Sequence, residues 1–232
     1  EWIRQRVGIE SRHIALAHET NTMMSSEAAK MALNNAGCDA DDIDLLIVAT
    51  STPDDVMPSQ AVCVQQALGI TDAIAFDTVA ACSGFIYGLG IAEQFFATGA
   101  VKKALVIGAE RMSRVVNWED RATCVLFGDG AGAVVLEAAD TGGIIATKLH
   151  STGAHRDLLY IPNALPKNAF TPEADAAHLV MQGNKVFKSA VTLLGEVVDE
   201  ILADAGLQRS DIDWLVPHQA NERIITATAK KL

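Results

Sequence analysis

Short apolar runs alternate along the chain with longer segments in which apolar residues recur at helical spacing. Residues 45–49 and 73–79 are short, apolar and rich in β-favouring side chains, as buried strands are. Residues 26–35 and 84–98 have the period of helices, and the second of them is apolar nearly all round, so we expect it to be buried. Further strands are expected at 101–107, 133–136, 143–150 and 214–216, and further helices at 1–6, at 186–205 and from about residue 221. This alternation predicts a layered α/β fold.

One motif occurs twice with the same internal spacing. Residues 34–48 read NNAGCDADDIDLLIV and residues 203–217 read ADAGLQRSDIDWLVP. Each copy lies between a predicted helix and a predicted strand, and its glycine stands where a helix C-cap belongs. A single short match can arise by chance, but the shared order of elements favours two related halves, 1–140 and 141–232. Fewer residues follow the second copy than follow the first within its half, so we expect the second half to be truncated.

Composition excludes several classes of function. The 232 residues are 50% hydrophobic and carry a formal net charge of −11, which argues against a general nucleic-acid binder. No apolar run reaches the length of about 18 residues that a transmembrane helix needs. The cysteines lack the CxxC spacing of zinc sites and the pattern of disulfide scaffolds, so we expect no metal and a reducing, cytoplasmic location. They are Cys38, Cys63, Cys82 and Cys124.

Two residues of possible chemical function stand where a predicted strand gives way to a predicted helix. Cys82 lies in DTVAACSGF (77–85), where helix N–H groups and the helix dipole would lower the pKa of its thiol. A free cysteine that only fills core space is the alternative. His218 lies in WLVPHQANERII (214–225), and a purely structural histidine is the alternative there. Ligands of open α/β sheets bind beyond the carboxyl ends of strands, so we expect Cys82 and His218 to face each other as a nucleophilic thiol–imidazole pair.

The glycine-rich segment FGDGAGAVVLE (127–137) suggests a nucleotide-binding loop at first sight. Such loops follow a strand and open a helix, whereas this one leads into the strand-like residues 133–136. We therefore expect its glycines to permit close backbone packing rather than phosphate binding.

Four segments together resemble one known family. DTVAACSGFIYGL, FGDGAGAVVLE, GNKVF (183–187) and WLVPHQANERIITATAKKL are similar to β-ketoacyl-acyl carrier protein synthase III, of the thiolase superfamily, and the likeness extends over essentially the whole chain. The resemblance implies a duplicated αβαβα sandwich. It also implies a condensing enzyme that initiates type II fatty-acid synthesis from acetyl-CoA, or another short acyl-CoA, and malonyl-acyl carrier protein. Coenzyme A would take part as the substrate thioester, and no cofactor is expected.

The resemblance also implies roles for individual residues. Cys82 would be the acylated nucleophile, and His218 would donate a hydrogen bond to the malonyl thioester oxygen during decarboxylation. The family's catalytic Asn, in an NTS-type motif, has no match in these residues, and GNK at 183–185 is not its counterpart. Met57 aligns with a position that reaches across a homodimer interface into the partner's acyl pocket.

The remaining implied residues bind the two substrates. Coenzyme A would be held by Trp2 and Arg121 around the adenine, by Arg6 near the phosphates, and by Asn184, Phe187, Ala220 and Asn221 along the pantetheine arm. The acidic carrier protein would dock on Lys188, Arg223, Lys230 and Lys231, although a lysine pair can equally be a solvated helix face.

Two other functions stay open at this point. One is a related acyltransferase of the superfamily, a thiolase or a polyketide-type synthase. The other is a non-catalytic paralogue that binds acyl carrier protein, against which the presence of both Cys82 and His218 speaks.

Overall fold

The computed structural model describes residues 1–163 and 178–231. The chain divides into two compact units. The sheet unit comprises His13–Arg111 and Gly128–Leu149, and the helical unit comprises Glu1–Arg12, Met112–Phe127 and His150–Leu232. The boundary near residue 140, between the two halves expected from the sequence repeat, stays a prediction.

The sheet unit is built on four strands in the order β2-β1-β3-β4. The central strand β1 is parallel to both β2 and β3, and β4 is antiparallel to β3. The parallel strands confirm the expected α/β organisation, because parallel neighbours need helical crossovers between them. The bounds are Leu45–Ala49 for β1, Ile74–Thr78 for β2, Lys103–Arg111 for β3 and Asp129–Glu137 for β4.

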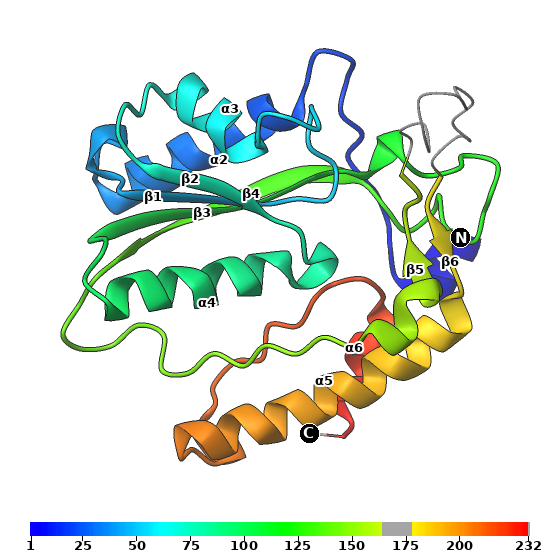
Figure 1. The fold of residues 1–232 in the computed structure, drawn as a ribbon. Helices are drawn as coiled ribbons and strands as arrows, with labels where there is room; N and C mark the ends of the chain where they lie inside the picture. The colour runs from blue at the N-terminus through cyan, green and yellow to red at the C-terminus, as the bar shows by residue number, and fades with distance from the viewer. Residues whose placement is uncertain (164–177, 232) are drawn as a thin grey trace. The chain divides into compact units, whose positions relative to one another are not determined.

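Helices cover both faces of this sheet. Helices α2 (Asn21–Ala36) and α3 (Gln60–Leu68) lie on one face, and α4 (Gly84–Ala97) lies on the other (Figure 1). All five residues of β1 are buried, as a strand covered on both faces requires.

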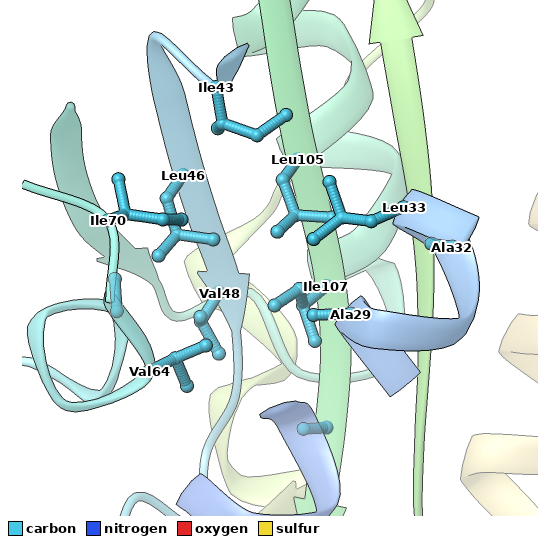
Figure 2. Close-up of a cluster of buried hydrophobic side chains, with 12 residues drawn as sticks. Ala29, Ala32, Leu33, Ile43, Leu46, Val48, Val64, Ile70, Leu105 and Ile107 are labelled. Atoms are coloured by element: carbon cyan, nitrogen blue, oxygen red, sulfur yellow. The ribbon is translucent and has the colours of Figure 1, made fainter. Parts of the chain in front are cut away.

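Each face of the sheet has its own hydrophobic core. Figure 2 shows the core on the α2 and α3 side, where side chains of β1 and β3 meet those of the two helices. It includes Leu46, Val48, Leu105, Ile107, Ala29, Leu33 and Val64. The core under α4 takes the alternate residues of the same strands, Leu45, Ile47, Ala104 and Val106, together with Ala92 of the helix and Val101.

The described part of the helical unit consists mainly of three α-helices and a short strand pair. Helices α5 and α6 pack against each other, and α1 contacts α6. The strands β5 and β6 pair antiparallel. The bounds are Trp2–Val7 for α1, Leu159–Tyr160 for β5, Val180–Met181 for β6, Gly183–Ala205 for α5 and Glu222–Ala229 for α6.

The sequence repeat corresponds to a repeated local structure. Gly37 ends α2 and Gly206 ends α5, both in the left-handed conformation, with φ of 64° and 67°. A 3-10 turn follows each glycine, Ala40–Asp42 in the first copy and Arg209–Asp211 in the second. In each turn the aspartate of the shared motif accepts a hydrogen bond from a backbone N–H three residues earlier, at 3.1 Å for Asp42 and 2.8 Å for Asp211.

Two predicted strands are wrong. Residues 143–150 and 214–216 have no strand structure, although the equivalent of 214–216 in the first copy is β1. A strand requires a hydrogen-bonded neighbour. β1 has one on each side, whereas neither segment is paired in the part of the chain that the structure describes. Trp214 and Val216 are accordingly 86% and 81% exposed.

Candidate active site

Cys82 lies at the junction between strand β2 and helix α4. It is the middle residue of a 3-10 turn, Ala81–Ser83, and α4 begins at Gly84. The predicted position at a helix start is therefore confirmed. Ala81 has φ of 46°, the one positive φ of a non-glycine residue within the described ranges. Such strain is held only where the surrounding structure enforces it, and it is concentrated at functional sites.

Close packing of α4 onto the sheet fixes this turn in place. A Cβ on Gly84 would lie 3.0 Å from the Cβ of Ala49, at the end of β1, and a Cβ on Gly108 of β3 would lie 3.6 Å from the ring of Phe85. The first turn of α4 therefore rests on the carboxyl end of β1 and on the residue of β3 that pairs with it. Cys82 lies at this edge of the sheet, where α/β folds bind their ligands.

The thiol of Cys82 has a higher pKa than an ordinary cysteine. Desolvation raises the pKa of Cys82, and the negative charge of Glu110 raises it further, while a backbone hydrogen bond lowers it. A backbone N–H therefore does lower this pKa, as expected at a helix start, but burial and Glu110 outweigh it, so the net shift is opposite to the predicted one. The residue as a whole is exposed even though protein surrounds its thiol, so it does not merely fill core space as the buried Cys124 does.

Glu110, which the motifs did not single out, is held rigidly beside this turn. Its two carboxylate oxygens accept hydrogen bonds from the Ser51 N–H at 2.7 Å and from the Thr52 hydroxyl at 2.5 Å. Burial raises the pKa of Glu110 in spite of these bonds. A sequence signal was present, since Glu110 is an acidic residue that directly follows the apolar run 104–109 of β3.

His218 follows the irregular segment 214–217 and precedes α6 in the helical unit. The residue as a whole is exposed to solvent, but protein atoms near the ring desolvate it, and this lowers the pKa of the imidazole. At neutral pH this shift favours the neutral ring, which can donate one hydrogen bond. Cys82 and His218 belong to different units, and their pairing stays a prediction.

Trp2 and Arg121 meet within the helical unit. The guanidinium carbon of Arg121 lies 4.8 Å from the centroid of the Trp2 ring, and Trp2 is 47% exposed. The two residues are far apart in sequence, so the fold brings together a pair that the resemblance assigned to adenine binding. Arg6 is an exposed residue of the same helix, α1.

The other substrate-binding candidates gather on α5 and α6. Asn184, Phe187 and Lys188 lie in the first two turns of α5, and Ala220 and Asn221 immediately precede α6. Asn221 caps that helix, accepting from the Arg223 N–H at 2.9 Å. Lys188 also lines a cavity of about 270 Å³ together with His155, Ser189, Thr192 and Leu193.

The basic residues of the proposed docking face have contacts of their own. The Arg223 guanidinium donates to the Gln5 carbonyl at 3.2 Å, and Lys231 Nζ to the Val191 carbonyl at 3.5 Å. Lys230 is the C-cap of α6.

Met57, the residue that the resemblance assigns to the partner's acyl pocket, lies in the sheet unit and is 85% exposed.

Two family models match the segments that contain Cys82 and His218. Residues 76–153, which include Cys82, match 3-oxoacyl-[acyl-carrier-protein] synthase III, and residues 202–232, which include His218, match the C-terminal model of that family. The whole chain is 54% identical to the β-ketoacyl-[acyl-carrier-protein] synthase III of Methylococcus capsulatus and covers 72% of that protein. The chain belongs to this family. It is therefore an acyltransferase of the condensing-enzyme type, as the sequence motifs predict.

Solved synthase III structures share the fold. The enzyme of Aquifex aeolicus is 44% identical, with a TM-score of 0.90 over 99% of this chain and 71% of its own. The priming β-ketosynthase of the R1128 polyketide pathway is 38% identical, with a TM-score of 0.93 over 100% of this chain and 69% of its own. These neighbours confirm the thiolase-like α/β fold class. Within residues 1–163 and 178–231, no helix combines the length and apolar character needed to cross a bilayer.

Proposed function

We propose that this synthase III homologue carries out the priming condensation of type II fatty-acid synthesis. Cys82 attacks the thioester of acetyl-CoA or another short acyl-CoA, forming an acyl-cysteine and releasing the coenzyme A thiol. Malonyl-acyl carrier protein then loses CO2, and the resulting carbanion attacks the acyl group and frees the Cys82 thiol. One observation carries this proposal: Cys82, within the segment that matches the family, occupies a strained, exposed turn between β2 and α4.

His218 serves the second half of this reaction. As the malonyl group loses CO2, negative charge develops on its thioester oxygen, and a hydrogen bond from a neutral imidazole stabilises that charge. The lowered pKa of His218 supports this role, because the neutral ring does not need to lose a proton first. Because the pKa of the resting Cys82 thiol is raised, its proton is lost during acylation and ends on the departing coenzyme A sulfur.

Coenzyme A binds to the helical unit. The pair formed by Trp2 and Arg121 supports adenine binding, since a flat base stacks on an indole and on a guanidinium plane. Arg6 offers a cation to the phosphates from the same helix as Trp2. The pantetheine arm runs along the starts of α5 and α6, past Asn184, Phe187, Ala220 and Asn221.

The carrier protein binds the same unit through basic side chains. Lys188, Arg223, Lys230 and Lys231 lie on or beside α5 and α6, in a chain whose net charge is −11. Such a local basic face attracts an acidic partner that the rest of the surface repels.

Two consecutive apolar residues of the sheet unit, Val56 and Met57, are 80% and 85% exposed, which supports a homodimer contact there. Four free cysteines support a reducing, cytoplasmic compartment.

Labelling with radioactive acetyl-CoA tests the nucleophile. We expect the label on the peptide that contains Cys82, with no labelling of Cys82→Ser and normal labelling of the matched control Cys63→Ser. His218→Ala should still be acetylated but should lose about 10²–10³ in the rate of malonyl decarboxylation. Label on another cysteine, or unchanged condensation by His218→Ala, would contradict these roles.

The likeness to a polyketide priming enzyme supports a second candidate, the priming of a polyketide chain by the same chemistry. A scan of acyl-CoA primers of increasing length against malonyl-acyl carrier protein separates the two. Preference for acetyl and other short primers supports fatty-acid initiation, and preference for longer primers supports the polyketide role.

A further inference from the structure

The face of the sheet that α4 covers carries a single ionisable side chain. On each strand alternate residues point to this face, as the core under α4 shows. Within the four described strands these positions hold apolar residues, glycines, one threonine and Glu110. They are Leu45, Ile47 and Ala49 on β1, Ile74, Phe76 and Thr78 on β2, Ala104, Val106, Gly108 and Glu110 on β3, and Gly130, Gly132, Val134 and Leu136 on β4.

Glu110 stands at the end of this face that is nearest Cys82. The strand register places Thr78, Ala49 and Gly108 side by side, and Glu110 follows Gly108 by two residues on the same face. The start of α4 rests on Ala49 and Gly108, and Cys82 is two residues before that start. The carboxylate of Glu110 and the thiol of Cys82 therefore share one edge of the sheet.

The carboxylate of Glu110 cannot turn away from this position. One oxygen accepts from the Ser51 N–H at 2.7 Å and the other from the Thr52 hydroxyl at 2.5 Å. The oxygen of that hydroxyl in turn accepts from the Arg111 N–H at 2.7 Å, so the threonine proton is directed at Glu110. Because the loop that follows β1 holds both oxygens, the charge is fixed in place.

The other charged groups around the turn are engaged elsewhere. Asp77 accepts the Gln60 and Ala61 N–H groups at the start of α3, on the opposite face. Asp54 accepts the Asn21 and Thr22 N–H groups at the start of α2. Glu93 accepts from the Thr147 hydroxyl further along α4, and the Arg111 guanidinium donates to the Leu16 carbonyl. The thiol of Cys82 responds to the charge of Glu110, which raises its pKa.

We propose that Glu110 is a positioning residue for the nucleophile, whose fixed negative charge keeps the resting Cys82 thiol protonated. Its effect is to suppress reactions of Cys82 with stray electrophiles until the acyl donor is bound. The proposal deepens the proposed function, on which it rests by taking Cys82 as the nucleophile. Glu110 touches neither substrate in this account and acts only through the sulfur.

The pH profile of Cys82 alkylation tests the proposal. The rate of carbamidomethylation of Cys82 by iodoacetamide is followed by peptide mass spectrometry in the wild type, Glu110→Gln, Glu110→Asp and Glu93→Gln. Removing the charge stabilises the thiolate, so Glu110→Gln should move the profile to lower pH and speed alkylation at neutral pH by about threefold or more. Glu110→Asp keeps the charge and should stay near the wild-type profile. Glu93→Gln removes an equal charge from α4 and should leave the profile unchanged.

Three results would overturn the proposal: a Glu110→Gln profile that superimposes on the wild type, an equal shift in Glu110→Asp, or an equal shift in Glu93→Gln. If Glu110→Gln does not fold, the wild type itself provides the test. A fixed carboxylate should make anionic iodoacetate slower relative to iodoacetamide at Cys82 than it is at 2-mercaptoethanol, a thiol without carboxylates, and an equal or higher ratio of iodoacetate to iodoacetamide rates at Cys82 would refute the role. Alkylation needs no acyl donor, so failure of acetyl-CoA labelling would count against the proposed function alone.

Discussion

A methyl group added at Gly88 would set two known effects against each other. Gly88 is a buried residue inside α4, and a Cβ there would lie 2.8 Å from Cγ1 of Val106 and 3.6 Å from Cγ2 of Ile47. Replacing a helical glycine by alanine stabilises the helix by about 1 kcal/mol. Forcing a methyl into a filled core costs about 1–3 kcal/mol.

The surroundings of Val106 decide which effect is larger. Val106 is fully buried in the middle of β3, which is paired with β1 on one side and β4 on the other. It cannot retreat without moving the sheet, so the clash should outweigh the helix propensity. We expect Gly88→Ala to lower the free energy of unfolding of the sheet unit by up to about 2 kcal/mol.

A second substitution reverses the sign. Val106→Ala removes the clashing Cγ1 at a cost of about 2–4 kcal/mol for the cavity it leaves. In that background Gly88→Ala should raise stability by about 1 kcal/mol, since only the propensity remains. Gly195→Ala is a control for helix propensity in the other unit, read from the exchange of α5 peptides: its Cβ would meet only the Lys231 side chain at 3.8 Å, so it should be neutral or stabilising for α5.

The assay must report on the sheet unit itself. All three tryptophans, Trp2, Trp118 and Trp214, belong to the helical unit, so their fluorescence is a poor probe of the sheet. Amide hydrogen exchange of β3 peptides, read by mass spectrometry, gives the local opening free energy directly. An equal loss of protection from Gly88→Ala with and without Val106→Ala would show that the steric reasoning is wrong.

Two further predictions concern acid stability and coenzyme A. Burial raises the pKa of Asp54, but hydrogen bonds from Thr22 and Asn21 outweigh it and hold the pKa below the ordinary 3.8. The resulting stabilisation is present above pH 3.8 and is lost as the pH falls through the lower folded pKa. Asp54→Asn should therefore be less stable than the wild type at pH 7 and should lose less stability on acidification. If urea titrations at pH 7 and pH 3 show the same loss of stability in both proteins, this prediction is wrong. Trp2→Ala should weaken coenzyme A binding about tenfold, as measured by calorimetry. The control Trp118→Ala removes the ring whose centroid lies 5.8 Å from the Arg12 guanidinium carbon, and it should leave the affinity unchanged. Equal affinities in the wild type and Trp2→Ala would argue against the adenine site.

Local features of the fold could be predicted because they depend on neighbouring residues. The helical period of 84–98 and the apolar run 45–49 correspond to α4 and β1, and the two glycines of the repeat are the C-caps of α2 and α5. Propensity, burial pattern and capping are properties of a few adjacent side chains. The same holds for the position of Cys82 at a strand–helix junction, which follows from the period of the residues on either side of it.

Features that depend on distant partners could not be predicted in this way. Residues 214–216 have the composition of a strand but no paired neighbour in the described chain, so pattern alone misjudged them. The pKa of Cys82 depends on how much protein surrounds the sulfur and on a charge 28 positions later, at Glu110. The contact between Trp2 and Arg121 likewise joins α1 to a segment more than 100 residues away.

The sequence by itself determined the order of helices and strands, the position of the candidate nucleophile and the family to which the chain belongs. Only the tertiary structure decided the electrostatic state of that nucleophile, because Coulomb and desolvation energies depend on distances through space rather than along the chain. Glu110 illustrates the difference. In the sequence it is one of 29 acidic residues, and in the fold it is the one ionisable side chain that the described strands direct to the α4 face.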